Sequence, residues 1–225
     1  MPYRGGAKKG PALPQVLGGV GSDLDNFGCP RCGAHDRERH LLMYLRASGQ
    51  LAEMRGKVVV HFAPEKHLCR FILASGPAQY VRCDLYPKSS EIRKMDMLAM
   101  DFESGSVDVL IANHVLEHVA SDAQALAEVR RVLKPGGYAI LQTPYCKKLH
   151  KIWEDAGIDD DAGRTQAYGQ EDHVRLYGRD IFERFAAAGF QSRVRQHEDL
   201  LPKVDAYVSG INCEEPLFLF QRDMK

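Results

Sequence analysis

The sequence lacks an excess of either charge, a long apolar run and an apolar N-terminal stretch. Lysine plus arginine total 30 and aspartate plus glutamate total 30. The chain therefore has no overall attraction for nucleic acid, which binds largely through clustered basic residues. The longest apolar runs, such as Val58 to Val60 and Leu217 to Phe220, are too short to span a bilayer, and the N-terminus does not resemble a signal peptide. We expect a cytoplasmic protein that binds neither nucleic acid nor a membrane.

Cysteine is sparse, and the six cysteines are scattered apart from one closely spaced pair, Cys29 and Cys32. In a reducing compartment they indicate free thiols or a metal site rather than a disulfide framework. Two thiolates at this spacing can hold a tetrahedral zinc ion, but zinc needs four ligands. The residues that could complete the site are His35, His40, Cys146 and Cys213. Structural zinc, a turn without metal and a redox pair all remain open.

The length of 225 residues suits one domain with a small appendage. Residues 1–27 contain several glycines and no apolar periodicity, which predicts a flexible or loosely docked arm. Residues 28–54 follow as a knuckle around the Cys-x-x-Cys pair and a helix that begins near Leu41. Residues 55–225 form the main domain, and within it residues 144–178 form a long polar connection of the kind that caps a site.

Strands and helices alternate from residue 57 onward. Expected strands span residues 57–62, 80–83, 107–112, 138–143, 190–196 and 216–222, with a weak one before Asp96, and expected helices span 64–74, 122–133 and 178–188. This alternation is typical of parallel βαβ units with helices on both faces of the sheet. We therefore predict an α/β fold with a Rossmann-like, mostly parallel sheet.

Two aspartates follow strands at the edge where open α/β sheets bind ligands, the carboxyl ends of the strands. Asp84 ends the second strand, where a carboxylate can accept hydrogen bonds from both hydroxyls of a ribose; a simple turn before Leu85 is the alternative. Asp96 follows the third strand and can bind the amine of adenine, while the backbone of Met97 binds a ring nitrogen. Asp101 competes for this role, although it also suits the lead-in to the next strand.

The strongest signal is the run Asp108-Val-Leu-Ile-Ala-Asn-His-Val-Leu-Glu-His-Val119, followed by Ala127-Glu-Val-Arg-Arg-Val-Leu-Lys-Pro-Gly-Gly137. Both segments resemble the fourth-strand and post-strand motifs of class I methyltransferases that use S-adenosylmethionine (SAM). The resemblance covers roughly Lys57 to Arg222. It implies a seven-stranded sheet whose last strand is antiparallel, SAM as the methyl donor, and Asn113 and His114 beside the cofactor.

The turn after the first strand departs from that family. A glycine-rich turn is usual there, because only glycine lets the backbone approach the methionine part of SAM closely. This chain carries His61-Phe62-Ala63-Pro64-Glu65, in which Ala63 is small and Glu65 can bind the SAM ammonium. It is similar to a less common subgroup with an Ala-Pro-Glu turn, an N-terminal Cys-Pro-x-Cys segment and a Gly-Gln-x-Asp-His-Val-Arg stretch. The cofactor contacts that we expect are His61, Ala63, Glu65, Asp84, Leu85, Asp96, Met97, Asn113 and His114.

The stretch from Gly169 to Gly178 is the predicted acceptor side, because the resemblance places it over the transferring methyl group. Methyl transfer from a sulfonium needs close alignment, and a base only when the acceptor is a hydroxyl or a protonated amine. His173, held by Asp172 or another carboxylate, is the first candidate for that base, and His114 is the second. The alternatives are a stacking role for His173 in a cap pinned by an Asp and Arg pair, and a structural role for His114. The acceptor contacts that we expect are Tyr145, Gln170, Arg175 and Tyr177.

His114, Glu117 and His118 also match the His-x-x-Glu-His pattern of some zinc hydrolases. That pattern requires a long helix that carries both histidines, whereas here it follows a buried strand, so we set hydrolysis aside.

The leading hypothesis is methyl transfer to an oxygen or nitrogen of a small molecule, such as a sugar, a polysaccharide precursor or a secondary metabolite. A SAM-fold binding module without catalysis, and a macromolecule-modifying enzyme that docks through the knuckle, are the alternatives. The sequence leaves open a homodimer.

Overall fold

A seven-stranded sheet forms the centre of the protein. The computed structural model describes residues 1–2 and 12–224, and the strand order is β4-β3-β2-β5-β6-β9-β8. The strands are β2 (Val58–Phe62), β3 (Gln79–Asp84), β4 (Arg93–Lys94), β5 (Val107–Ala112), β6 (Leu133–Ile140), β8 (Phe190–Ser192) and β9 (Leu219–Arg222). The pairs from β4 through β6 are parallel, whereas β9 pairs antiparallel with β6 and β8. The predicted Rossmann-like fold with an antiparallel last strand is confirmed.

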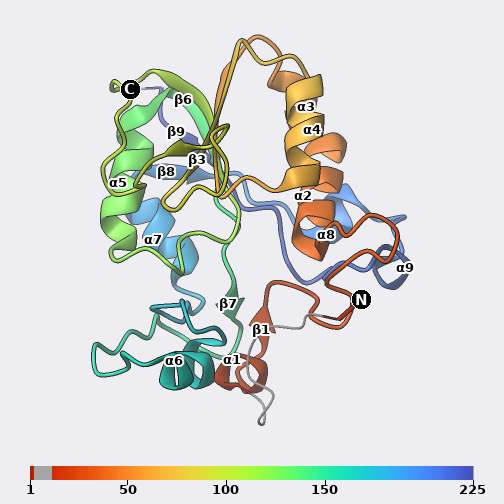
Figure 1. Ribbon diagram of the computed structural model, residues 1–225, viewed down its shortest axis with the longest axis vertical. Helices are drawn as coiled ribbons and strands as arrows, with labels where there is room; N and C mark the ends of the chain where they lie inside the picture. Colours follow the sequence, from red (N-terminus) through yellow and green to blue (C-terminus); the bar gives the residue numbers. More distant parts are fainter. Residues whose placement is uncertain (3–11, 225) are drawn as a thin grey trace.

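Helices cover both faces of this sheet (Figure 1). On one side lie α2 (Asp36–Ala47), α3 (Gln50–Glu53) and α4 (Lys66–Ala74), and on the other lie α5 (Asp122–Val132) and α7 (Ile181–Ala187). Two short helices, α8 (His197–Leu200) and α9 (Ala206–Ser209), lie between β8 and β9 in the chain. Among the described helices, none is both long enough and apolar enough to cross a membrane.

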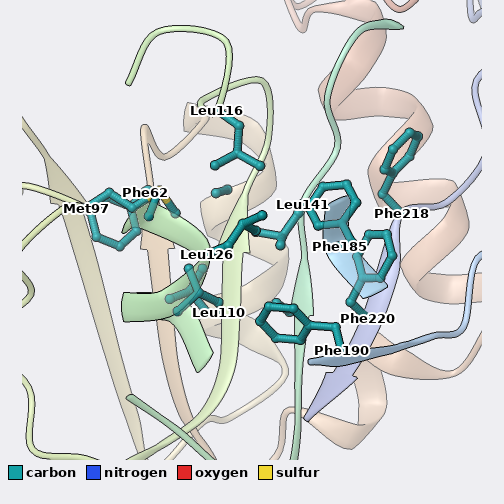
Figure 2. Packing of buried hydrophobic residues seen from close by; sticks show 14 of the residues in the cluster. Phe62, Met97, Leu110, Leu116, Leu126, Leu141, Phe185, Phe190, Phe218 and Phe220 are labelled. Carbon is teal, nitrogen blue, oxygen red and sulfur yellow. The ribbon is translucent and has the colours of Figure 1, made fainter. Parts of the chain in front are cut away.

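Residues that alternate along each strand divide the core into two layers. In β5, Leu110 packs with residues of α5 and α7, whereas its neighbours Val109 and Ile111 pack with residues of α2 and α4. The first layer is rich in aromatic rings, and those of Phe185 and Phe220 stack with their centroids 4.1 Å apart (Figure 2). This burial on both faces fixes the strands, and with them the positions of the residues that follow each strand.

Two element boundaries differ from the expectation. Helix α2 begins at Asp36 rather than near Leu41, because His35 and Glu38 form a capping box in which the His35 N–H donates to Glu38 Oε1 at 2.8 Å. Strand β6 begins at Leu133 rather than at residue 138, and its register with β5 shifts around Gly136, which has a φ of +76°. Both differences come from polar or glycine-containing segments that carry no apolar periodicity.

The N-terminal arm and the cap form a small module at one end of the sheet (Figure 1). It contains α1 (Leu13–Val16), β1 (Gly19–Val20), β7 (Tyr145–Cys146) and α6 (Asp161–Tyr168), and β1 pairs antiparallel with β7. Residues 3–11 of the arm lie outside the described residues. The described part is docked rather than flexible, because the exposed edge of β7 supplies backbone partners that the arm sequence alone does not reveal.

Candidate active site

The turn after β2 brings the backbone of Ala63 to the carboxyl edge of the sheet. Ala63 has a φ of +46°, a left-handed conformation that costs a residue other than glycine about 1–2 kcal/mol. Its N–H donates to the Cys83 carbonyl at 2.9 Å, and its small side chain is exposed. Ala63 therefore adopts the backbone conformation that glycine favours, even though the turn lacks glycine.

Glu65 precedes α4 and is held by two other predicted cofactor residues. Its Oε2 lies 3.0 Å from Nε2 of His61, and its Oε1 accepts a hydrogen bond from Asn113 Nδ2 at 2.5 Å. His61 is fully buried and contacts the Tyr80 hydroxyl at 2.9 Å, so it lies behind Glu65 rather than at the open edge. Oδ1 of Asn113 is buried and has no hydrogen-bond partner among the described residues. A ligand with an ammonium group would satisfy it.

His61 and Glu65 form a nearly buried ion pair. Burial alone would lower the pKa of His61, but its interactions with Cys69 and Glu65 outweigh burial and raise the pKa to about 9. Burial would likewise raise the pKa of Glu65, but the hydrogen bond and charge of His61 lower it instead. The pair is therefore charged at neutral pH, which keeps a carboxylate at the N-terminus of α4.

We expect the free energy of unfolding to fall as the pH rises from about 6.5 to about 9. Because folding raises the pKa of His61 from 6.5 to about 9, its stabilising contribution is complete below the lower value and is lost as the pH passes the upper one. This difference corresponds to roughly 3 kcal/mol. The groups that face His61 are Glu65, Tyr80 and Cys69. Urea unfolding of the protein and of His61→Gln should give a flatter pH dependence for the variant; equal slopes would contradict the assignment.

Asp84 lies at the end of β3, as predicted, and makes a turn contact there. Its Oδ1 accepts a hydrogen bond from the Tyr86 N–H at 2.8 Å, while Oδ2 has no hydrogen-bond partner among the described residues. The next residue, Leu85, leaves an apolar side chain 41% exposed beside it. The turn and the predicted ribose contact are thus compatible, because one carboxylate oxygen stays available.

Asp96 is exposed at the same edge, and its Oδ1 accepts a hydrogen bond from the Leu98 N–H at 2.9 Å. The side chain of Met97 is buried in the core beside Phe62 (Figure 2). The backbone N–H of Met97, which the adenine prediction uses, has no partner among the described residues. The competing Asp101 is instead paired with Arg93.

His114 follows β5 with a φ of +54° and is enclosed by two carboxylates. Its Nε2 lies 3.1 Å from Glu215 Oε1, and its Nδ1 lies 3.5 Å from Glu117 Oε1. Burial would lower the pKa of His114, but these carboxylates raise it to about 9. The same contact outweighs the burial of Glu117 and lowers its pKa to about 2. A protonated His114 has no lone pair for a substrate proton, so this geometry favours the structural alternative over the predicted base.

Residues far from the motifs complete this region, and the sequence did not reveal them. Glu215 lies 101 positions after His114. Gly21 of the arm also packs here, since a Cβ placed on it would lie 3.5 Å from the His114 ring. The Gly21 carbonyl accepts a hydrogen bond from Asn212 at 2.9 Å. No motif marks these residues, because tertiary packing alone brings them to the site.

The cap places His173 under Tyr168 and beside His118. Nδ1 of His173 lies 3.0 Å from the Tyr168 carbonyl, which can only accept, so Nδ1 carries the proton and Nε2 keeps its lone pair. That Nε2 is buried without a partner among the described residues, and burial lowers the pKa of His173. The sequence suggested that Asp172 holds His173. In the structure, Oδ2 of Asp172 lies 3.2 Å from Nδ1 of His118 instead. In the sequence, only the His-x-x-Glu-His pattern marks His118 as a candidate functional residue.

Arg175 holds the loop after β5, contrary to the expectation that it contacts the acceptor. It is 2% exposed, and its Nε donates to Glu154 at 2.8 Å. Its remaining nitrogens donate to the carbonyls of Leu116, Val119 and Ala120. This matches the alternative of a pinned cap, with Glu154 in place of an aspartate.

The other predicted acceptor contacts lie in different environments. Tyr177 is buried, and its hydroxyl donates to the Leu116 carbonyl and Asp122, so it too pins the cap. Tyr145 is buried against the ring of Phe182. Gln170 is partly exposed, and its carbonyl accepts from the His173 N–H at 3.4 Å. Among these three residues, Gln170 is the one with a backbone contact to His173.

The knuckle holds Cys29 and Cys32 in one turn, in which the Gly33 N–H donates to the Cys29 carbonyl at 2.9 Å. Backbone hydrogen bonds from Cys32 and Arg31 lower the pKa of Cys29. Within the part of the chain that the structure describes, no third metal-ligating group joins the pair. The nearest expected partner in the helix, His40, faces His197 at 3.0 Å instead. The geometry therefore does not assemble the predicted zinc site.

Comparison with known proteins gives matches to methyltransferases. The model of a methyltransferase domain family matches residues 55–141. A transposon-encoded, uncharacterized protein of Streptomyces fradiae is 33% identical over 103 residues, which are 46% of this chain and 26% of that protein. An uncharacterized methyltransferase of Mycobacterium leprae is 30% identical over 118 residues, which are 52% of this chain and 40% of the relative. The chain thus matches less than half the length of these curated relatives.

Among solved structures, the fold is similar to a Burkholderia thailandensis 1,6-didemethyltoxoflavin-N1-methyltransferase with bound 1,6-didemethyltoxoflavin and S-adenosylhomocysteine. The TM-score is 0.53 at 15% identity, and the match covers 80% of this chain and 78% of that chain. This likeness concerns the fold, and the family match concerns the segment from β2 to the end of β6, where the cofactor motifs stand. Residues 55–141 of the chain thus match a methyltransferase domain family, and the fold around them is similar to that of a solved methyltransferase.

Proposed function

We propose that this chain transfers a methyl group from SAM to an oxygen or nitrogen atom of a small molecule bound under the cap. The observation that carries the proposal is that two buried polar atoms have no hydrogen-bond partner among the described residues. One is Oδ1 of Asn113, which directly follows β5, and the other is Nε2 of His173, in the cap. Leaving such an atom unpaired costs about 1–3 kcal/mol. A site that binds a cofactor and an acceptor would satisfy both.

The residues at the carboxyl edge fit SAM along its length. Glu65 and Asn113 offer carboxylate and amide oxygens to its ammonium, and Oδ2 of Asp84 is available to its ribose. Asp96 and the free N–H of Met97 fit the polar edge of adenine. Ala63 has a positive φ, the conformation that glycine usually supplies where the backbone approaches the methionine part of SAM.

SAM supplies an electrophilic methyl group on its sulfonium. The acceptor atom donates an electron pair to the methyl carbon, the S–C bond breaks with its pair left on sulfur, and the acceptor's proton passes to water. The protein aligns the two reactants and excludes competing water. Gln170 and His173 are the cap residues that face the acceptor in this proposal.

A small acceptor, such as a sugar, a polysaccharide precursor or a secondary metabolite, suits a site that the arm and cap cover. Gly21 packs against His114, and the cap is tied to the loop after β5 by Arg175. The fold neighbour from Burkholderia thailandensis also carries a small acceptor in its structure. A polymer would have to displace these covering segments.

Calorimetric titration with SAM and with S-adenosylhomocysteine tests the proposal. We expect micromolar binding of at least one of the two, followed by methyl transfer in a screen of hydroxyl and amine acceptors. Folded protein that binds neither compound would contradict the proposal and favour a binding module without catalysis.

Asp84→Ala should weaken S-adenosylhomocysteine binding by roughly 1–3 kcal/mol, the cost of leaving the ribose hydroxyls without their acceptor. Asp101→Ala is the matched control, because Asp101 is an exposed aspartate paired with Arg93. Its affinity should equal that of the unmodified protein. If Asp84→Ala binds as tightly as the control, the ribose is held elsewhere.

A further inference from the structure

Three side chains that the proposed reaction does not fully use converge beneath the cap. Glu117 and His118 follow β5, and His173 comes from the cap; one ligand atom of each lies within 4.8 Å of the other two. Glu117 is 1% exposed and His173 is 6% exposed. Two imidazoles and a carboxylate at this separation have the composition of a transition-metal site.

The atoms that point into this cluster lack hydrogen bonds. Both carboxylate oxygens of Glu117 and Nε2 of His173 are buried and unpartnered among the described residues. The nearest side-chain nitrogens to Glu117 are Nδ1 of His114 at 3.5 Å, an ion-pair distance, and Nε2 of His118 at 4.0 Å. The charge of His114 offsets part of the cost of burying Glu117, but two carboxylate oxygens and an imidazole nitrogen remain buried without a close hydrogen-bond partner, so the cluster can accept a further cationic ligand.

The outer contacts of both histidines orient the same ring nitrogen inward. Nδ1 of His173 faces the Tyr168 carbonyl at 3.0 Å. Nδ1 of His118 faces the carboxylate of Asp172 at 3.2 Å and its carbonyl at 3.3 Å. All three partners are acceptors, so each Nδ1 carries the proton and each Nε2 offers a lone pair. Metal-ligating histidines are fixed in this way by carbonyls and carboxylates.

We propose that Glu117, His118 and His173 bind a divalent first-row transition-metal ion. Mixed nitrogen and oxygen ligands suit manganese, iron, cobalt or zinc better than magnesium or calcium, which prefer oxygen alone. Ligand bonds of about 2.0–2.2 Å require the three side chains to close slightly. His118 can make that movement, because it is the most exposed of the three, with 31% of its side chain accessible.

The proposed cation gives the acceptor a chemical class, and this step rests on the proposed methyl transfer. Three protein ligands leave coordination positions open, and a hydroxyl bound there loses its proton to water more readily. Its oxygen then attacks the methyl carbon with the bond changes described above. The acceptor is therefore a small molecule with a hydroxyl group that can bind metal. His173 acts as a ligand in this scheme rather than as the base itself.

Cobalt(II) is a suitable probe, because its spectrum separates histidine and carboxylate ligands from thiolates. We expect the chelator-treated protein to bind one Co²⁺ with visible d–d bands and no thiolate charge-transfer band, and Mn²⁺ to compete for it. His118→Ala and Glu117→Gln should weaken Co²⁺ binding by at least about tenfold, since even outer-shell changes cost about 10–100-fold. His150→Ala, an exposed cap histidine, and the Cys29→Ser/Cys32→Ser double variant should bind like the unmodified protein.

Titration of each variant with S-adenosylhomocysteine shows whether its cofactor site is folded and separates the two proposals. Protein that binds S-adenosylhomocysteine but not Co²⁺ would overturn the metal site and leave methyl transfer standing. Protein that binds Co²⁺ through these residues but neither SAM nor its product would retain the metal site and overturn the proposed function. Unchanged Co²⁺ affinity in His118→Ala, or a thiolate band lost in the double cysteine variant, would place the ion elsewhere.

Discussion

Arg175→Ala should lower the free energy of unfolding by about 3–5 kcal/mol, because three backbone carbonyls lose hydrogen bonds from a charged donor, each worth about 1.5–3 kcal/mol. The guanidinium is 2% exposed, and it donates to Glu154 and to three backbone carbonyls between Leu116 and Ala120. Alanine would leave these carbonyls without donors and open a cavity under the cap. For a chain of this size, each kcal/mol shifts the melting temperature by about 2–4 °C, so we expect a decrease of roughly 10 °C.

Two further variants show whether the stability of the protein depends on the several hydrogen bonds of the Arg175 guanidinium or only on its charge. Arg175→Lys keeps the charge but cannot reach several carbonyls at once, so it should recover only part of the loss. Arg179→Ala removes an exposed arginine that directly follows the cap and whose Nη2 lies 2.6 Å from His150, and should change the free energy of unfolding by less than about 0.5 kcal/mol. Similar melting temperatures for Arg175→Ala and Arg179→Ala would mean that the cap does not depend on this contact.

The sheet could be predicted from the sequence because its signals are local. The strand at residues 107–112 has the predicted bounds, since it is a short run of β-branched and apolar residues followed by a strong motif. The turn at Ala63 and the carboxylate of Asp84 also lie where strand ends were expected. A residue's place along a strand fixes which edge of the sheet it reaches, and this inference needs no tertiary information.

The partners within the site could not be predicted, because they depend on packing between distant segments. Adjacency in sequence suggested that Asp172 holds His173, but the backbone turns between them and Asp172 reaches His118. The sequence suggests that Arg175 contacts the substrate, but no sequence pattern distinguishes a side chain that binds substrate from one that binds backbone carbonyls. In the structure, Arg175 donates to the Leu116 carbonyl. The arm likewise lacks apolar periodicity, and its strand β1 forms only because β7 offers a free edge.

The two histidines that were candidates for the base differ in what surrounds them. Two carboxylates raise the pKa of His114 to about 9, so it serves as a cation between Glu117 and Glu215. Burial lowers the pKa of His173, and its inward nitrogen has no partner among the described residues. From the sequence, His173 is the first candidate for the base, and its lowered pKa and unpaired nitrogen are consistent with that role. The same lone pair can bind a metal ion as well as a proton.

His173→Ala should lower turnover by about 100-fold or more, the scale of a lost base or an equivalent activating group, while S-adenosylhomocysteine affinity stays within about threefold. His173 lies in the cap, whereas the predicted cofactor contacts lie at the ends of β2 and β3 or follow β2, β3, β4 and β5. His150→Ala is the control, because it removes an exposed cap histidine. Wild-type turnover in His173→Ala on an accepted substrate would exclude any direct role for the imidazole.

The dependence of the remaining His173→Ala activity on Mn²⁺ separates a ligand from a base. If His173 is a ligand, Glu117 and His118 still bind the ion weakly, so saturating Mn²⁺ should restore at least about tenfold of the lost rate. If His173 removes the acceptor proton itself, occupancy by metal does not replace the missing nitrogen, and the rate should not respond to Mn²⁺. In that case the unmodified enzyme should also keep its rate after chelation, because its neutral imidazole would be sufficient. Restoration by Mn²⁺ together with loss of activity on chelation would therefore assign the lone pair of His173 to a metal ion.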